Sequence, residues 1–366
     1  MQARSSVELD HELYQESLEL LRTLIETPSL SREEDKTAAH IESFLGVAGI
    51  HHERCANNLI ALPDTFEKDK PSLLLNSHHD TVAPNRGYTR DPYSADIKGD
   101  HLFGLGSNDA GGALVALLYT FRRFNNKTLP FNLVWVASAE EEVSGKNGIS
   151  TVLESYHDLD IQMGIVGEPT GMEAAVAEKG LMVIDVTTYG VSGHAARDIG
   201  DNAIYKGLDQ IARIRDYTFE KDSTHLGPVR MSVTQVNAGQ QHNVIPDECR
   251  WVIDVRSTDL YDNKCILGIL ERIIEGQVVP RSTRLNSSFL EDDHVLYKSA
   301  RELSIKCFGS PTLSDQALMR FPTIKIGPGM SERSHTADEY ILLSELQAGM
   351  LGYCIYLEKI IEKFNG

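Results

Sequence analysis

The sequence is poor in the features that mark disulfide-rich, membrane-spanning and nucleic-acid-binding proteins. Five cysteines occur in 366 residues, far apart and without a Cys-x-x-Cys pair: Cys55, Cys249, Cys265, Cys307 and Cys354. This spacing argues against a thiolate zinc site and against a disulfide framework. No apolar run reaches the length of a membrane span, and the first ten residues contain no apolar signal core. We therefore expect a cytoplasmic protein.

Positive charge is also scarce. The chain has 35 Lys and Arg against 53 Asp and Glu, which gives a formal net charge of −18. Nucleic acids and anionic membranes are bound by basic patches, so we expect neither as a partner. The composition, 41% hydrophobic and 24% charged, is that of a soluble globular protein, and 366 residues exceed one ordinary core. Two domains are therefore expected.

Short apolar strands alternate with helices over most of the chain, which predicts an α/β domain with a mostly parallel central sheet. Near Gly180 the pattern changes to half-exposed alternating strands and amphipathic helices. Their order is β-α-β-β-α-β, with the last strand expected near Thr283, and this is the ferredoxin-like α+β unit. We expect residues 1–177 and 288–366 to form the main domain, with residues 178–287 inserted into it.

Two local signals predict helices in the main domain. Ser31-Arg32-Glu33-Glu34 matches a capping box, so a helix is expected to start there and to run to about Val47. A second helix is expected over Asp293–Phe308, ahead of an apolar strand at Thr323–Ile326.

Histidines and carboxylates follow the apolar strands of the main domain. Leu73–Leu75 leads into His78 and Asp80, Phe131–Ala137 into Glu141 and Glu142, and Met163–Val166 into Glu168. The last apolar strand leads through Gly327-Pro328-Gly329 to His335, and Asp109 lies at the start of a helix. Each residue alone would more often be structural or solvated. Because parallel strands deliver their carboxyl ends to one edge of a sheet, we expect these side chains to meet.

Imidazole and carboxylate ligands suit zinc, with cobalt or manganese as substitutes. The set holds more carboxylates than one zinc ion uses, which favours two metal ions bridged by a carboxylate, with one glutamate left as a base. A water molecule bound to zinc has a lowered pKa, so it becomes a hydroxide-like nucleophile near neutral pH.

These motifs together resemble the di-zinc acetylornithine deacetylase and succinyl-diaminopimelate desuccinylase family, which also holds aminoacylases and glutamate carboxypeptidases. The resemblance covers nearly the whole chain. It rests on Ser77-His78-His79-Asp80, the Gly-x-Gly-Ser-x-Asp109 stretch, Glu141-Glu142, Gly167-Glu168-Pro169, Gly327-Pro-Gly with His335, and the inserted domain with His194, Asn243 and Arg256. It implies a zinc-peptidase-like catalytic domain and an inserted lid or dimerisation domain.

The resemblance also implies roles for individual residues. His78, Asp109 and Glu168 would hold one zinc ion. Asp109, Glu142 and His335 would hold the other, so that Asp109 bridges the pair. Asp80 would hydrogen-bond the far nitrogen of His78 and fix its tautomer, whereas His79 would point away and be structural.

Three glutamates stand in a row, so the register of this motif is a separate prediction. The family pattern is acid-Glu-Glu-hydrophobic, and here Val143 follows Glu142. This alignment makes Glu141 the general base, which passes a proton from water to the leaving amine, and Glu142 a metal ligand. A shift by one residue is the alternative.

In the inserted domain the resemblance implies substrate contacts. His194 in Gly190-Val-Ser-Gly-His194 would reach the partner subunit's site in a homodimer and steady the oxyanion. Asn243 would help to hold the substrate, and Arg256 would bind a substrate carboxylate. For Arg256 and Arg197 the alternative is a surface charge, which for Arg197 would pair with Asp198 or Asp201.

The sequence departs from many relatives in two places: Asp109-Ala110-Gly111-Gly112 lacks a usual lysine, and Ala195-Ala196-Arg197-Asp198 replaces a small-residue and proline pattern.

The favoured function is deacylation of N-acetyl- or N-succinyl-ornithine in arginine biosynthesis. A desuccinylase of lysine biosynthesis, an aminoacylase and a dipeptidase are alternatives within the family. A non-catalytic amino-acid-binding protein is the alternative from another class.

Overall fold

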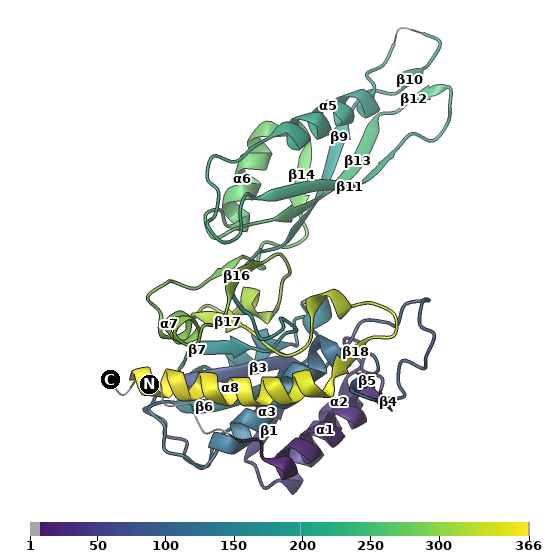
Figure 1. Cartoon of the computed structure of the whole chain (residues 1–366). Helices are drawn as coiled ribbons and strands as arrows, with labels where there is room; N and C mark the ends of the chain where they lie inside the picture. Colours follow the sequence, from purple (N-terminus) through teal and green to yellow (C-terminus); the bar gives the residue numbers. More distant parts are fainter. Residues whose placement is uncertain (1–7, 198, 365–366) are drawn as a thin grey trace. The chain divides into compact units, whose positions relative to one another are not determined.

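The computed structural model describes residues 8–197 and 199–364 and divides into two compact units (Figure 1). Unit 1 contains the residues through Val176, Leu290–Phe308 and the residues from Ser314 onward, and unit 2 contains Ala177–Phe289 and Gly309–Leu313. The short segment Gly309–Leu313 was expected in the main domain. It joins unit 2 because the backbone N–H of Lys179 donates to the carbonyl of Ser310 at 3.1 Å.

The centre of the main sheet in unit 1 is parallel. β3 (Ser72–His78) lies between β6 (Asn132–Ser138) and β7 (Ile161–Val166), and β7 pairs in parallel with β17 (Thr323–Lys325). β1 (His52–Cys55) and β2 (Asn58–Ala61) add antiparallel strands beyond β6. Beyond β17 lies the antiparallel strand β8 (Ala174–Glu178), in which the chain passes from unit 1 into unit 2. β15 (Ser288–Phe289) and β16 (Cys307–Ser310) pair with β8. The predicted α/β class is confirmed.

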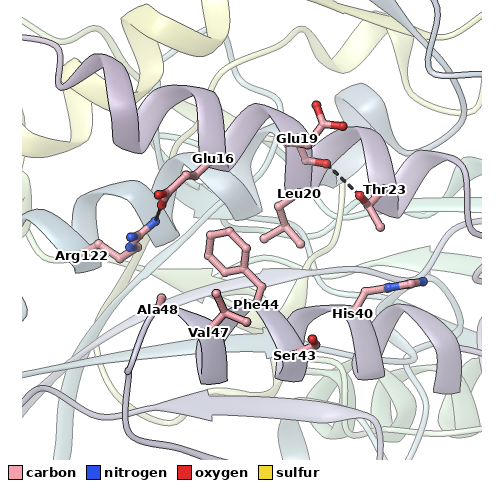
Figure 2. Close-up of a pocket in the computed structure, with 10 residues that line it drawn as sticks. All are labelled: Glu16, Glu19, Leu20, Thr23, His40, Ser43, Phe44, Val47, Ala48 and Arg122. Atoms are coloured by element: carbon pink, nitrogen blue, oxygen red, sulfur yellow. Dashed lines mark hydrogen bonds and ion pairs between the residues drawn. The ribbon is translucent and has the colours of Figure 1, made fainter.

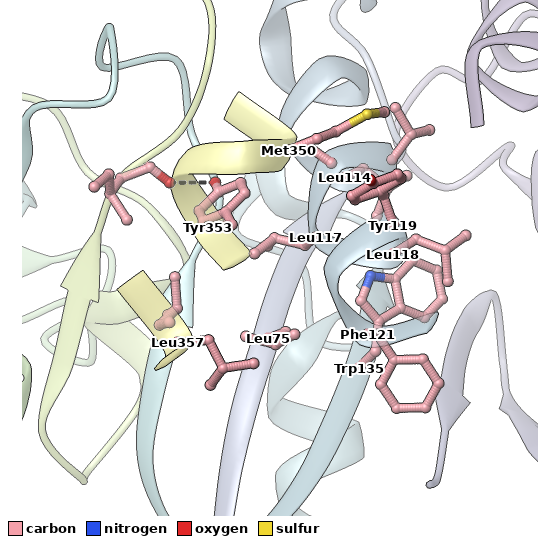
Figure 3. Close-up of a cluster of buried hydrophobic side chains, with 14 of the residues drawn as sticks. Leu75, Leu114, Leu117, Leu118, Tyr119, Phe121, Trp135, Met350, Tyr353 and Leu357 are labelled. Carbon is pink, nitrogen blue, oxygen red and sulfur yellow. Dashed lines mark hydrogen bonds between the residues drawn. The ribbon is translucent and has the colours of Figure 1, made fainter. Parts of the chain in front are cut away.

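The apolar runs of the sequence become strands that are buried on both faces. Every residue of β3 and of β6 is buried, which is typical of central parallel strands covered by helices. α3 (Gly112–Phe124) packs against α8 (Leu343–Phe364) and against both strands. Figure 3 shows leucines of α3 beside Met350, Tyr353 and Leu357 of α8, and the Tyr353 hydroxyl donates to the carbonyl of Ile326.

Unit 1 also contains the α-helices α1 (His11–Ile25), α2 (Asp35–Val47), α4 (Ile149–Ser155) and α7 (Val295–Glu302). The short strands β4 (Ile97–Lys98) and β5 (His101–Phe103) form a hairpin, and β5 also pairs with β18 (Tyr340–Leu342). Within residues 8–197 and 199–364, no helix is long and apolar enough to cross a membrane.

Three local predictions were wrong. α2 begins at Asp35, and its N-cap residue Glu34 makes no side-chain capping bond, so Ser31–Glu34 is not a capping box. α7 ends at Glu302 rather than Phe308, because Cys307 and Phe308 belong to β16. The strand expected near Thr283 is β14 (Gln277–Pro280), whose register is fixed by pairing with β9 (Met182–Tyr189).

Unit 2 has the ferredoxin-like topology. Its elements follow as β9 (Met182–Tyr189), α5 (Ala203–Asp216), β11 (Arg230–Ala238), β13 (Glu248–Arg256), α6 (Asn263–Ile273) and β14. The antiparallel sheet has the order β11-β13-β9-β14. Alternate residues of β9 and β13 are buried, among them Trp251 and Ile184, and they form a separate hydrophobic core with the helices. A short ribbon pairs β10 (Gly193–His194) with β12 (Val244–Ile245).

Candidate metal centre

Histidine and acidic side chains meet at the carboxyl edge of the parallel strands. His78 is the last residue of β3 and lies in register with Ser138, the last residue of β6. The turn η2 (Glu141–Val143) follows β6, and Glu168 comes two residues after β7. Asp109 lies in η1 (Ser107–Gly111), the irregular turn that leads into α3, and its peptide bond to Ala110 is cis. His335 follows the short turn η5 (Ser331–Arg333).

The carboxylate of Asp109 faces two different imidazoles. Its Oδ1 lies 3.3 Å from Nε2 of His78, and its Oδ2 lies 3.6 Å from Nε2 of His335. A carboxylate placed in this way has one oxygen available for each of two metal ions. Asp109 would therefore be placed to bridge the ions of a two-metal site.

The other acidic residues complete the two halves of the cluster. Nε2 of His78 lies 4.0 Å from Oε1 of Glu168, and Nε2 of His335 lies 3.0 Å from Oε2 of Glu142. One potential ligand atom from each of His78, Glu141 and Glu168 lies within 4.8 Å of the others, as do those of His78, Asp109 and Glu142. The structure thus brings together all five expected ligands and Glu141.

Crowding of these groups alters their proton affinities. Burial, together with the charge of Asp109, raises the pKa of Glu168 to about 8. Burial and neighbouring carboxylates also raise the pKa of Glu141. The hydrogen bond to Glu142 raises the pKa of His335 to about 9. Burial lowers the pKa of His78, but its hydrogen bonds to Asp109 and Asp80 and the nearby carboxylates outweigh this and raise the value overall. A divalent cation would relieve the repulsion among the carboxylates, so this donor set fits a metal pair.

The three consecutive glutamates point in different directions. The Glu140 carboxylate is buried and accepts a hydrogen bond from Nδ2 of Asn147 at 2.8 Å, so it is engaged outside the cluster. Glu142 contacts His335, and Glu141 lies with His78 and Glu168. Glu141 and Glu142 therefore both reach the cluster, whereas Glu140 does not.

Asp80 contacts His78 in a way that the sequence did not predict. Nδ1 of His78 lies 2.9 Å from the backbone carbonyl oxygen of Asp80 and 3.4 Å from its carboxylate Oδ1. The carbonyl therefore makes the shorter contact with the ring. His79 points away, as expected: its Nδ1 lies 2.9 Å from the Thr37 hydroxyl and its Nε2 lies 2.9 Å from the carbonyl of Asn57. Burial lowers the pKa of His79 to about 4, which suits a structural role.

Two buried acids beside the cluster were missed in the sequence. Glu339 accepts the backbone N–H groups of Asn108 and Asp109 at 2.9 and 3.0 Å, and burial raises its pKa to about 8. Asp315 accepts hydrogen bonds from Nδ2 of Asn76 at 2.9 Å and from Oγ of Ser138 at 2.6 Å. Burial raises the pKa of Asp315 to about 6. Neither lies in a motif that the sequence analysis singled out, so no signal there marked them.

The expected substrate contacts of the inserted domain all lie in unit 2. His194 in β10 pairs with Val244, and the N–H of Ala195 donates to the carbonyl of Asn243 at 3.0 Å, so His194 and Asn243 share one ribbon. Arg256 ends β13 and makes a two-point ion pair with Asp254 at 2.8 and 3.2 Å.

Arg197 is exposed, and its backbone N–H donates to the carbonyl of His194 at 2.8 Å. Of its two expected surface partners, Asp201 forms an ion pair with Lys206, and Asp198 lies outside the described residues.

A separate hollow lies between α1 and α2 (Figure 2). Its volume is about 440 Å³, and its lining includes Arg122 and Glu16, which form an ion pair. Val47 at its rim is 89% exposed. None of its lining residues belongs to the carboxylate cluster, so it is distinct from the candidate metal centre.

The chain is similar to known proteins in sequence and in fold. Residues 74–359 match the model of peptidase family M20/M25/M40. The succinyl-diaminopimelate desuccinylase of Parvibaculum lavamentivorans is 25% identical over 90% of this chain and 92% of its own. The acetylornithine deacetylase of Pectobacterium carotovorum is 27% identical over 88% of this chain and 92% of its own.

Among solved structures, a dinuclear metal-binding peptidase of the M20 family from Bacillus subtilis superposes with a TM-score of 0.75. It is 18% identical and covers 96% of this chain and 99% of its own, so the likeness shows the fold. The family match spans well over half of the residues and confirms the resemblance seen in the motifs. The chain therefore belongs to peptidase family M20/M25/M40.

Proposed function

We propose that this protein is a metal-dependent hydrolase that cleaves the N-acyl amide bond of an N-acyl amino acid. The observation that carries the proposal is the position of Asp109, whose two carboxylate oxygens lie 3.3 and 3.6 Å from Nε2 of His78 and of His335. Family membership and the two relatives named as deacylases support this reaction class.

The residues present fit two zinc ions. His78, Asp109 and Glu168 would hold one, and Asp109, Glu142 and His335 would hold the other. Imidazole nitrogens and carboxylate oxygens are the ligands of catalytic zinc sites, and these sites leave a position open for water or substrate. Bound zinc supplies Lewis acidity, which polarises an amide carbonyl and makes water nucleophilic near neutral pH.

Glu141 is the proposed general base. It lies beside His78 and Glu168, and the Glu140 carboxylate is engaged by Asn147. In this role Glu141 takes a proton from the attacking water and delivers it to the nitrogen of the leaving amine. A raised pKa suits both halves of that transfer, because a base is most effective when its pKa approaches the working pH. Asp80 orients the His78 ring and completes the set of catalytic residues.

The residues of unit 2 are assigned to the substrate. Arg256 carries a planar fork of donors suited to the α-carboxylate of an amino acid, and Asn243 adds an amide close in sequence to that strand. His194 would donate a hydrogen bond to the acyl oxygen as negative charge develops there. We propose that it does so across a homodimer formed through the inserted domain, in the cytoplasm.

The favoured substrates are N-acetyl- and N-succinyl-ornithine, with succinyl-diaminopimelate as the main alternative. A succinyl group brings a second carboxylate, which is costly to bury without a cationic partner. Arg197, three residues after His194, is the candidate for that partner. An acetyl group would need no such contact.

A substrate panel tests the proposal. Zinc-loaded enzyme is assayed by amine release on acetylornithine, succinylornithine, acetylcitrulline and succinyl-diaminopimelate, with the Glu141→Gln variant as a matched inactive control. We expect turnover of at least one ornithine substrate by the parent enzyme and a large loss in the variant. Turnover of none of the four would contradict the proposal, and turnover of succinyl-diaminopimelate alone would favour the alternative.

A further inference from the structure

Ser31 and Glu34 have the spacing of a helix cap but contact the catalytic edge of the sheet instead. α2 begins at Asp35 and receives no side-chain capping bond from Glu34. Both side chains instead make hydrogen bonds to residues at the carboxyl ends of β3 and β6. Local capping therefore does not explain why these two polar residues are half-buried or buried here.

Ser31 acts on the catalytic turn through Asp80. Its hydroxyl Oγ donates to Oδ2 of Asp80 at 2.7 Å. The same carboxylate accepts the backbone N–H of Glu141 at 3.0 Å on Oδ1 and that of Glu142 at 3.2 Å on Oδ2. Asp80 is completely buried. The orientation of its carboxylate therefore fixes the backbone of the base and of a metal ligand at once.

Glu34 contacts the first residue of the turn, Glu140, directly. It is completely buried, and its Oε1 accepts the backbone N–H of Glu140 at 3.2 Å. Its Oε2 accepts Nδ2 of Asn57 at 3.0 Å, while Oδ1 of Asn57 accepts from Nη2 of Arg54 at 2.9 Å. A flip of the Asn57 amide by about 180° would break its hydrogen bonds to Arg54 and Glu34. The amide therefore holds the Glu34 carboxylate in place.

Three successive backbone N–H groups, those of Glu140, Glu141 and Glu142, are thus accepted by two buried carboxylates. Glu140 itself adopts a left-handed backbone conformation with φ of 54°, which turns the chain sharply between β6 and η2. The directions of the Glu141 and Glu142 side chains depend on this turn. Small displacements of catalytic groups lower turnover steeply.

We propose that Ser31 and Glu34 are positioning residues, which hold the Glu140–Glu142 turn so that Glu141 faces the scissile amide and Glu142 faces Asp109 and His335. This inference rests on the proposed function, because the roles of Glu141 as base and Glu142 as metal ligand belong to that proposal. The hydrogen bonds that hold the turn do not depend on it.

The segment that carries Ser31 has independent anchors. The N–H of Thr81 donates to the carbonyl of Ser29 at 2.8 Å, and the Thr37 hydroxyl lies 2.9 Å from Nδ1 of His79. Removing the Ser31 hydroxyl should therefore leave the fold and these contacts intact. Its effect should be confined to Asp80 and the turn.

Hydrogen–deuterium exchange of the full-length, metal-free protein tests the positioning without reference to any substrate. Peptides that cover Ser138–Ser144 report the N–H groups of the turn. We expect about tenfold faster exchange in Ser31→Ala and in Glu34→Gln, which corresponds to the loss of about one hydrogen bond to a charged group. Ser31→Thr keeps a hydroxyl, and Glu33→Gln changes the exposed neighbour of Glu34, so both should exchange like the parent.

Kinetics on the zinc-loaded protein supply the second readout. Ser31→Ala should lower kcat about tenfold with KM and zinc content close to those of the parent, and Ser31→Thr should restore most of the loss. In an Asp80→Ala background, Ser31→Ala should cause no further loss, because its effect passes through Asp80.

Unchanged exchange of the turn in Ser31→Ala would overturn the inference, as would faster exchange with an unchanged kcat. Ser31→Ala decides the question even if Glu34→Gln fails to fold. A parent enzyme that cleaves no N-acyl amino acid would contradict the proposed function instead, and the exchange experiment would still decide whether the turn is held by these residues.

Discussion

Nε2 of His335 lies 3.0 Å from Oε2 of Glu142, although 193 positions separate the two residues in the chain. His335 reaches the contact from the turn after η5, and Glu142 from the turn that ends β6. The His335 side chain is 55% exposed, whereas Glu142 is nearly buried at 9%. Within this half of the candidate centre, His335 is therefore the solvent-exposed side chain and Glu142 the enclosed one.

Glu142→Gln should weaken one metal site and leave the other. Loss of even a supporting partner of a ligand costs about 10- to 100-fold in metal affinity, so the affinity of this site should fall by more than about a hundredfold. Zinc titration against a chromogenic chelator should then show one tight ion per chain instead of two. Two tight ions in the variant would show that Glu142 is not a ligand.

Glu141→Gln should keep both zinc ions and lose turnover. Proton transfer by a positioned base contributes about 10²- to 10⁴-fold, and a loss in that range is expected in kcat. Zinc content and kcat are measured on the same preparation. If this variant loses a metal ion and Glu142→Gln does not, the register of the three glutamates is wrong by one residue.

His194→Ala should retain its zinc ions but lose turnover if His194 serves the site of a partner subunit. Mixing this variant with Glu141→Gln should then restore partial activity, because one of the two sites in a mixed dimer has both groups. Subunit exchange is verified with differently tagged chains. Exchange without any recovery of activity would place His194 in its own chain's site or outside catalysis.

Asp315→Ala should destabilise unit 1. It would leave the buried donors Nδ2 of Asn76 and Oγ of Ser138 without the carboxylate that both contact. Oγ of Ser138 keeps the carbonyl of Ser77 at 3.2 Å as an acceptor, so the main cost comes from Nδ2 of Asn76. An unsatisfied buried polar group costs about 1–3 kcal/mol, and a loss in that range is expected. Urea unfolding of the metal-free protein measures it, with Asp69→Ala at an exposed position as the control. Equal midpoints for the two variants would contradict this role of Asp315.

The parts of the fold that sequence patterns predict well are those in which local and tertiary preferences agree. β3 and β6 read as continuous apolar runs because both of their faces are buried, and that burial also identifies them as central parallel strands. Their polar ends then point to the candidate site, since ligands bind at the carboxyl edge of such a sheet. His78 and Glu141 follow from this argument alone.

Other features depend on contacts that no local pattern encodes. Ser31 and Glu34 satisfy the spacing of a capping box, yet Ser31 bonds to Asp80, and Glu34 accepts the N–H groups of Arg32 and Glu140. Asp315 lies in a polar loop like many solvated acids, and only the fold buries it beneath β3 and β6. The pairing of His335 with Glu142 could be predicted only through the family resemblance.

The most direct test of this account is metal analysis combined with an amide hydrolysis assay on the same protein. The account predicts two zinc ions per chain in the fully loaded enzyme, loss of N-acyl amino acid hydrolysis after exhaustive chelation, and recovery when Zn²⁺ or Co²⁺ is returned. Full hydrolytic activity in protein stripped of metal would contradict it.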